Sequence, residues 1–453
     1  MKKYLPFVLV LFAFGPKTSL PTVASAKVGL PTGQVGSDLP ATHWLQYKTP
    51  EDAGFSTQKL LKARDLAKKY KSANVLIIYK GAIVQSWGDA SRRFRLHSAR
   101  KATQSALIGI HASRGEIDLT KSMGEYGIDE VTPLTEIEKQ ATVKQLMTGY
   151  SGIYLPSPGG GGVDEIPKRG SHKPGEHWYY NNWNYNALNT VFEQQTHVKL
   201  TDAFDSEIAK PLGMEDFIPR DAFSYSHDYS LHPLYHINMS SRDLARFGML
   251  YMQEGRWNDQ QIIPQPWVKE SLTAYSPKEK KPGFGYAWNI YPEKTFRQRC
   301  YTAEGSGGHA LILLQDSDMI IVHRANTYIE PWVAVDWTEI KEIVKGILAA
   351  RTEIKTTIDE TKLITYQPDR THWPALIADD PSQTKRFEKY YDNDGDPVTI
   401  LRAKDGQLIV NIRYLGNFNL YPITNNTFFV EGKEETIYFT YNDAGEPIKA
   451  VFP

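Results

Sequence analysis

Two side chains that could act together on a carbonyl group, Ser98 and Lys101, lie three residues apart in the segment 94–115. Residues 102–112 include no formally charged side chain, and their apolar residues go around the helical wheel, which predicts a helix buried on all sides. Residues three apart share one face of a helix, and burial can lower the pKa of a lysine from about 10.4 toward neutrality. Such a lysine is a plausible base for the Ser98 hydroxyl, and a helix N-terminus favours the negative charge that develops on attack.

The Ser-x-x-Lys spacing is weak by itself because the chain contains it three times. The other two pairs are Ser56/Lys59 and Ser382/Lys385. Ser56 opens a lysine-rich surface helix that we expect to end near Tyr70, and Ser382 lies in an expected linker. Both serines are therefore interpreted as helix caps or solvated side chains.

Two further segments contain groups that could complete such a site. In the segment Trp178–Asn182, a tyrosine phenol beside an ammonium group could ionise or relay a proton, although the segment alone is typical of aromatic packing. Residues 305–309, Gly-Ser-Gly-Gly-His, precede an expected strand. Glycines there would let the backbone approach a ligand, and a strand-edge N–H could form half of an oxyanion hole; alone, the segment is typical of a turn.

The surrounding elements must hold these segments together. Strands are expected at 75–79 and 82–86, joined by Lys80-Gly81, and again at 284–291, 310–314 and 319–323. Helices are expected between the two groups of strands, including 240–253, and a final helix at 335–350. This order predicts an α/β (α+β) sandwich, an antiparallel sheet flanked by helices, with its first and last strands as neighbours.

Three segments, taken in order, resemble the active-site motifs of the β-lactamase and penicillin-binding-protein superfamily: Ser98-Ala99-Arg100-Lys101, Tyr180-Asn181-Asn182 and Ser306-Gly307-Gly308. Flanking segments are similar to its class C-like branch, which includes D-alanyl-D-alanine peptidases, carboxylesterases and 6-aminohexanoate-dimer hydrolases. These segments are 143–152, 174–176, 210–214, 240–245 and 284–286. The resemblance covers about residues 50–350 and implies an additional all-helical subdomain. It also selects Tyr180 and Asn182 over the pair one residue earlier.

The resemblance implies a role for each matching residue. Ser98 would attack a carbonyl to form an acyl-enzyme, and Lys101 and Tyr180 would shuttle the proton to the leaving group and then activate water. Asn182 would hold Lys101 and a substrate amide. The backbone N–H groups of Ser98 and His309 would bind the oxyanion, with residues 306–308 next to the substrate.

The third motif departs from the family pattern. Ser306 stands where β-lactamases and many peptidases have Lys or His, a position that often helps to hold a substrate carboxylate. We therefore expect a serine hydrolase of esters, amides or peptidoglycan-like substrates, with β-lactams less favoured. Gly149 likewise replaces a histidine that is common in the branch. The alternative is a non-catalytic protein that uses the same fold to bind cell-wall peptide or a similar ligand.

Composition limits the partners and the compartment. The 453 residues have zero formal net charge, so no excess of positive charge would draw the protein to nucleic acid or to an anionic membrane. Residues 1–26 have the basic start, apolar run and Ala24-Ser25-Ala26 of a signal peptide, so we expect a periplasmic or secreted protein without a stable membrane anchor. Cys300 is the only cysteine. We find no metal-ligand spacing such as His-Glu-x-x-His and no Gly-x-Ser-x-Gly elbow, and expect a small-molecule or peptide substrate and no cofactor.

The expected domains follow from these changes in composition. Residues 27–352 would form the hydrolase domain and 353–385, which contain three prolines and lack periodicity, a linker. Residues 386–453 consist of short β-rich runs separated by turn clusters such as Asp392-Asn393-Asp394-Gly395, which predicts a small all-β domain.

Overall fold

A computed structural model describes residues 43–159, 165–328, 333–354, 357–391, 397–413 and 415–452. The expected signal peptide and the loop glycines 160–162 lie outside these described residues. Among the helices that are described, none is long and apolar enough to cross a membrane.

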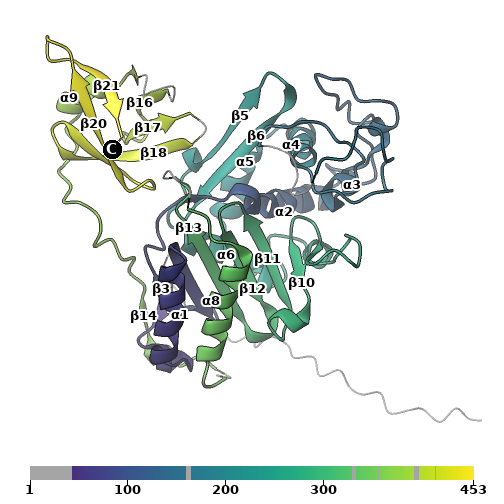
Figure 1. Ribbon diagram of the computed structural model, residues 1–453, viewed down its shortest axis with the longest axis horizontal. Coiled ribbons are helices and arrows are strands. Elements are labelled where there is room, and N and C mark those ends of the chain that lie inside the picture. Colours follow the sequence, from purple (N-terminus) through teal and green to yellow (C-terminus); the bar gives the residue numbers. More distant parts are fainter. Residues whose placement is uncertain are drawn as a thin grey trace, which may run out of the picture. The chain divides into compact units, whose positions relative to one another are not determined.

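The centre of the larger, N-terminal part is a nine-stranded sheet in the order β14-β1-β3-β2-β13-β12-β11-β10-β9 (Figure 1). Its strands are β1 Leu45–Tyr47, β2 Ser72–Tyr79, β3 Ala82–Trp87, β9 Gly283–Phe284, β10 Asn289–Tyr291, β11 Cys300–Gly305, β12 His309–Leu314, β13 Met319–Ala325 and β14 Leu363–Thr365. Neighbouring strands are antiparallel except β1 and β3, which are parallel. β2 pairs with β13, so the expected pairing of the early strands with the late ones is confirmed.

Helices cover both faces of this sheet. α1 (Thr57–Lys69) and α8 (Trp337–Ala350) pack together on one face (Figure 1), where Ile77 and Ile321 belong to the same core. α2 (Arg100–Ser113) and α6 (Ser241–Met252) share the core of the other face with Leu76 and Val322. Because both faces are covered, β13 reads as an almost continuous apolar run. The predicted α/β sandwich is confirmed.

The helical subdomain and two small sheets complete the N-terminal part. Its remaining helices are α3 Val143–Thr148, α4 Asn182–Thr196, α5 Leu200–Phe204 and α7 Gln265–Ser271. β4 (Phe94–Arg95), β6 (Ser230–Met239) and β5 (Ala222–His227) form a three-stranded sheet in that order, which the sequence did not predict. β7 (Arg256–Trp257) and β8 (Gln260–Gln261) form a short hairpin.

Two expectations about the sheet were wrong. Residues 284–291 form the two short strands β9 and β10 and not one strand, because the chain turns at Gly285, where a Cβ would lie 2.1 Å from the Ser271 carbonyl oxygen. The segment 353–385, expected as a linker, supplies β14, which pairs with β1 at the edge of the sheet. It also contains the short helix α9 (Pro381–Thr384).

The C-terminal part is the predicted all-β domain (yellow in Figure 1). Its seven antiparallel strands run in sequence order: β15 Tyr390–Tyr391, β16 Val398–Arg402, β17 Leu408–Ile412, β18 Gly416–Thr424, β19 Thr427–Val430, β20 Glu435–Tyr441 and β21 Pro447–Val451. β15 also contacts β21, so the sheet curls into a nearly closed barrel. Phe387, Phe428 and Phe439 are in its core.

His323 of β13 gives the fold a specific response to acid. Its ring is buried between the Ser72 hydroxyl at Nε2 (2.8 Å) and the Gly308 carbonyl at Nδ1 (2.6 Å), and burial lowers its pKa to about 4. The unfolded chain takes up a proton on this histidine near pH 6.5, before the folded protein does. The folded state therefore loses stability as the pH falls through that interval.

We predict that wild-type protein loses about 2 kcal/mol more unfolding free energy than His323→Gln between pH 7.5 and pH 5. Urea unfolding of both proteins at the two pH values measures this difference. An equal loss in both proteins would contradict it.

Candidate active site

Ser98 lies in a short 3-10 turn, η2 (His97–Ala99), that continues directly into α2. The structure therefore places Ser98 just before the α-helix. The sequence had predicted it in the first turn of that helix. His97 has a φ of 49°, a left-handed conformation that non-glycine residues rarely adopt. Residues 100–111 of α2 are all buried, whereas Ser98 is partly exposed. The helix is a rigid, buried support for an accessible hydroxyl.

Lys101 connects the first two predicted motifs. Its Nζ lies 3.0 Å from Ser98 Oγ and 2.5 Å from Asn182 Oδ1, and it also hydrogen-bonds the Tyr180 hydroxyl. The rings of Tyr180 and Tyr185 lie 4.5 and 5.0 Å from the same nitrogen. Lys101 is only 1% exposed, and none of these contacts is a carboxylate. Burial, together with the neighbouring Arg100 charge, lowers the pKa of this amine well below its usual value.

Tyr180 packs against two other aromatic rings. Its ring meets Phe284 edge-on at 5.6 Å and tilts against Tyr185 at 6.1 Å. Burial raises the pKa of the phenol above its usual value, while a hydrogen bond with Ser98 and the charge of Arg100 oppose that rise. The resting phenol therefore keeps its proton at neutral pH, and the amine is the better proton acceptor.

The structure also separates the two possible Tyr–Asn pairs. Asn181 caps α4, accepting from the Trp183 N–H at 2.9 Å and donating to the Ile153 carbonyl at 2.6 Å. Tyr179 is buried and packs edge-on against Tyr154 at 5.7 Å. Of the two pairs, it is Tyr180 and Asn182 that hydrogen-bond Lys101, and the Asn182 amide donates to the Gly159 carbonyl at 3.0 Å.

The backbone of the third motif packs against the Ser98 turn. A Cβ on Gly305 would be 2.2 Å from the Leu96 carbonyl oxygen and 3.1 Å from His97 Cβ, so the end of β11 packs directly on the turn. Gly307 and Gly308 have positive φ, and Gly308 is closed in by the Val335 carbonyl. Ser306 is exposed, and His309 begins β12 opposite Gly305. Only glycine at 305 allows this approach.

A hydrogen-bond bridge joins the Ser98 turn to the start of β12. His97 Nε2 and His309 Nε2 each lie 3.1 Å from Thr327 Oγ1, and the two rings stack at 5.1 Å. Burial and nearby arginines lower the pKa of both, that of His97 to about 3, so both rings are neutral. The hydroxyl can donate one hydrogen bond and accept two, so at least one of the two Nε2 atoms must donate to it.

Comparison with known proteins identifies the family. The family model described as Beta-lactamase matches residues 57–345, well over half of the chain. The chain belongs to the β-lactamase family. Members of this family are typically serine hydrolases, and the matched range includes all three predicted motifs.

Individual relatives of this β-lactamase-family protein are distant. An uncharacterized protein of Alkalihalophilus pseudofirmus is 21% identical over 294 residues, which are 57% of this chain and 85% of that protein. Among solved structures, a penicillin-binding protein homologue from Pyrococcus abyssi is 16% identical, with 88% of this chain and all of that chain covered and a TM-score of 0.49. A class C β-lactamase is 17% identical, with 66% and 97% covered and a TM-score of 0.49.

Several residues of this site were not found from the sequence. Tyr185 was not predicted as a neighbour of Lys101, and a positive φ at His97 leaves no sequence signal. Thr327 lies 229 residues from Ser98 in a segment without a motif. The presence of glycine at position 149, where the branch commonly has histidine, has a steric explanation. The φ of Gly149 is 83°, and a Cβ there would be 2.8 Å from the Trp178 indole nitrogen.

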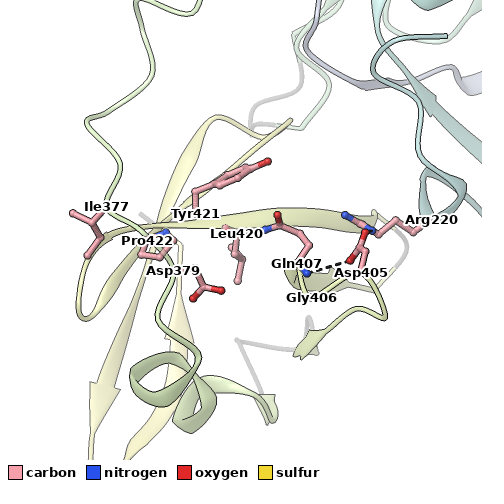
Figure 2. A pocket seen from close by; sticks show the side chains of 9 residues that line it. All are labelled: Arg220, Ile377, Asp379, Asp405, Gly406, Gln407, Leu420, Tyr421 and Pro422. Carbon is pink, nitrogen blue, oxygen red and sulfur yellow. Dashed lines mark hydrogen bonds and ion pairs between the residues drawn. The ribbon is translucent and has the colours of Figure 1, made fainter. Parts of the chain in front are cut away.

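A cavity of about 530 Å³ lies elsewhere, and Figure 2 shows that β18 provides part of its wall. Its charged side chains are already paired: Arg220 with Asp405 at 2.7 Å and Asp379 with Arg402 at 2.6 Å. None of the predicted site residues lines it. The lining residues are Arg220, Ile377, Asp379, Asp405, Gly406, Gln407, Leu420, Tyr421 and Pro422.

We predict that Ser98 reacts with a fluorophosphonate at a rate that rises with pH through the lowered pKa of Lys101, and so levels off at a lower pH than an ordinary lysine would give. Arg100→Gln removes a charge that lowers this pKa, so the rise should move to higher pH. Arg100→Lys keeps the charge and is the matched control. Rates measured from pH 5 to 10 test this, and identical profiles for the Gln and Lys variants would contradict it.

Proposed function

We propose that this protein is a serine hydrolase that acts through a covalent acyl-enzyme on ester or amide bonds of small or peptidoglycan-like substrates. The observation that carries the proposal is the contact of a buried lysine, free of any carboxylate in its hydrogen bonds, with Ser98 Oγ at 3.0 Å. A structural lysine would be expected to pair with an acid or reach solvent. A neutral amine beside a serine hydroxyl can accept its proton and so activate the serine oxygen as a nucleophile.

The proposed reaction uses the groups in a fixed order. The neutral Lys101 amine accepts the Ser98 proton as Oγ bonds to the substrate carbonyl carbon. The backbone N–H groups of Ser98 and His309 stabilise the oxyanion, a contribution of about 3 to 4 kcal/mol per lost donor in related chemistry. Lys101, through the Tyr180 hydroxyl bonded to it, passes the proton to the leaving alcohol or amine. The same pair then takes a proton from water as the water oxygen bonds to the acyl carbon, and returns that proton to Ser98 Oγ as the acid leaves.

Asn182 has two functions in this proposal. Its Oδ1 accepts a hydrogen bond from Lys101 at 2.5 Å and so fixes the direction of the amine. Its Nδ2 donates to the Gly159 carbonyl at 3.0 Å, and in the proposed complex the Asn182 side chain would also hydrogen-bond a substrate amide. The exposed Ser306 and the adjoining Gly307 and Gly308 would lie along the substrate.

The competing proposal is a binding protein that uses the same groove without turnover. A covalent probe separates the two. We predict that a fluorophosphonate labels wild-type protein and not Ser98→Ala. Ser56→Ala removes a serine with the same spacing to a lysine, one that caps α1, and should still be labelled. Folded wild-type protein that fails to label would favour the binding protein.

We further predict faster turnover of p-nitrophenyl acetate than of nitrocefin or a D-Ala-D-Ala peptide, because Ser306 gives a substrate carboxylate no cation. Lys101→Met should slow the favoured substrate by about 10²–10⁴-fold. Ser306→Lys, at an exposed position, should raise nitrocefin turnover relative to wild type. Rapid nitrocefin turnover by the wild type would contradict the substrate assignment while leaving the serine mechanism intact.

We also propose where in or outside the cell the protein acts. Residues 1–26 have the pattern of a signal peptide, which supports export to the periplasm or the medium. A small-molecule or peptide substrate is then the expected partner.

A further inference from the structure

Three residues from distant parts of the chain meet away from Ser98: Asp89 after β3, His372 in the segment after β14, and Glu434 in the turn between β19 and β20. One ligand atom from each lies within 4.8 Å of the others. His372 Nε2 is 3.1 Å from Glu434 Oε1. The set provides one imidazole nitrogen and two carboxylate oxygens.

Asp89 provides a second, independent indication that these residues bind a ligand. It is 6% exposed, and its Oδ1 accepts from the Ser91 N–H at 2.8 Å and from the Ser91 hydroxyl at 2.6 Å. Its Oδ2 is buried and has no hydrogen-bond partner among the described residues. A buried carboxylate oxygen without a partner is costly, so a ligand that satisfies it stabilises the protein.

The nearby arginines do not fill this position. Arg92 donates to Glu434 Oε2 at 2.8 Å and to the Gly432 carbonyl at 2.7 Å. Arg370 donates to the Ser91 hydroxyl at 3.2 Å. Glu434 Oε1 and Asp89 Oδ2 take no hydrogen bond from either guanidinium. The two guanidinium groups therefore offset the charge of the two carboxylates, and the case for a cation rests on the buried, unpartnered Asp89 Oδ2 beside the imidazole nitrogen.

The backbone fixes all three ligands in place. Asp89 follows Gly88, where a Cβ would lie 2.2 Å from the Ala73 carbonyl oxygen. His372 lies in a turn closed by the Trp373 N–H and the Arg370 carbonyl at 3.0 Å, and Trp373 packs on Phe429 at 5.0 Å. Glu434 has a φ of 59°. Ligands held in this way need little rearrangement to bind an ion.

We propose that Asp89, His372 and Glu434 form a Zn²⁺ site that cross-links these three segments, with water as the fourth ligand. A tetrahedral ion with bonds of about 2.0–2.1 Å places two ligands about 3.3 Å apart, close to the His372–Glu434 separation of 3.1 Å. The nitrogen donor favours Zn²⁺ over Ca²⁺, which takes six to eight oxygens. The site is structural and is separate from the proposed hydrolysis.

The test is zinc binding by the full-length protein. We expect isothermal titration with ZnCl₂ to show one equivalent bound, and the melting temperature to rise by a few degrees. Asp89→Asn, His372→Gln and Glu434→Gln should each weaken this binding by more than about tenfold. His43→Gln is the matched control, because His43 forms a similar pair with Glu215 (3.2 Å) outside the site and should bind zinc like the wild type.

His372 is exposed, so its variant should fold even if Asp89→Asn does not. The proposal is overturned if the wild type binds no zinc, or if His372→Gln binds zinc and gains thermal stability as the wild type does. A CaCl₂ titration that matches the zinc result would overturn the assignment to Zn²⁺. Ser98 labelling by a fluorophosphonate is measured in parallel and should be unaffected by His372→Gln, so this outcome is independent of the proposed function.

Discussion

The site depends on one buried amine. Lys101 is enclosed by two tyrosine rings, an asparagine oxygen and a serine hydroxyl, and none of its hydrogen bonds reaches an acid. An ammonium ion is costly in such surroundings, and a nearby arginine adds to the cost, so the environment favours the neutral form. Helix α2, buried from Arg100 to His111, makes this possible because it fixes the lysine where water cannot solvate it. The helix that supports Ser98 therefore also keeps the Lys101 amine in the neutral form that the proposed base needs.

The surrounding structure keeps the three motifs at a fixed separation. β11 ends at a glycine whose missing side chain leaves room for the backbone of the Ser98 turn, and the Thr327 hydroxyl joins the histidines on either side of that contact. The distance between the two expected oxyanion donors is then set by backbone packing and one hydroxyl. His323 connects the glycine turn to β2 and β13 in the centre of the sheet. Tertiary contacts, and not the motifs, supply this rigidity.

The sequence predicted much of this arrangement, and the parts it missed have physical reasons. Helix caps and the spacing of apolar residues predicted α1 and α6, an uncharged apolar run predicted α2, and the order of motifs predicted the grouping of Ser98, Lys101, Tyr180 and Asn182. The roles of those residues stay a prediction. The short strands β4, β9, β10 and β14 were missed or misjoined because two or three residues have no periodicity to detect. The Thr327 bridge could not be found, because a single hydroxyl between two histidines is defined only once distant segments meet.

The pairing of β14 with β1 affects where the N-terminal part can be separated from the rest of the chain. The family match stops at residue 345, before β14. A protein cut there would leave the hydrogen-bonding groups along the outer side of β1 open to solvent. Exposed strand edges of this kind pair readily with other chains. The segment that leads to the barrel therefore also protects the edge of the sheet through β14, and its removal would favour self-association of the remaining sheet.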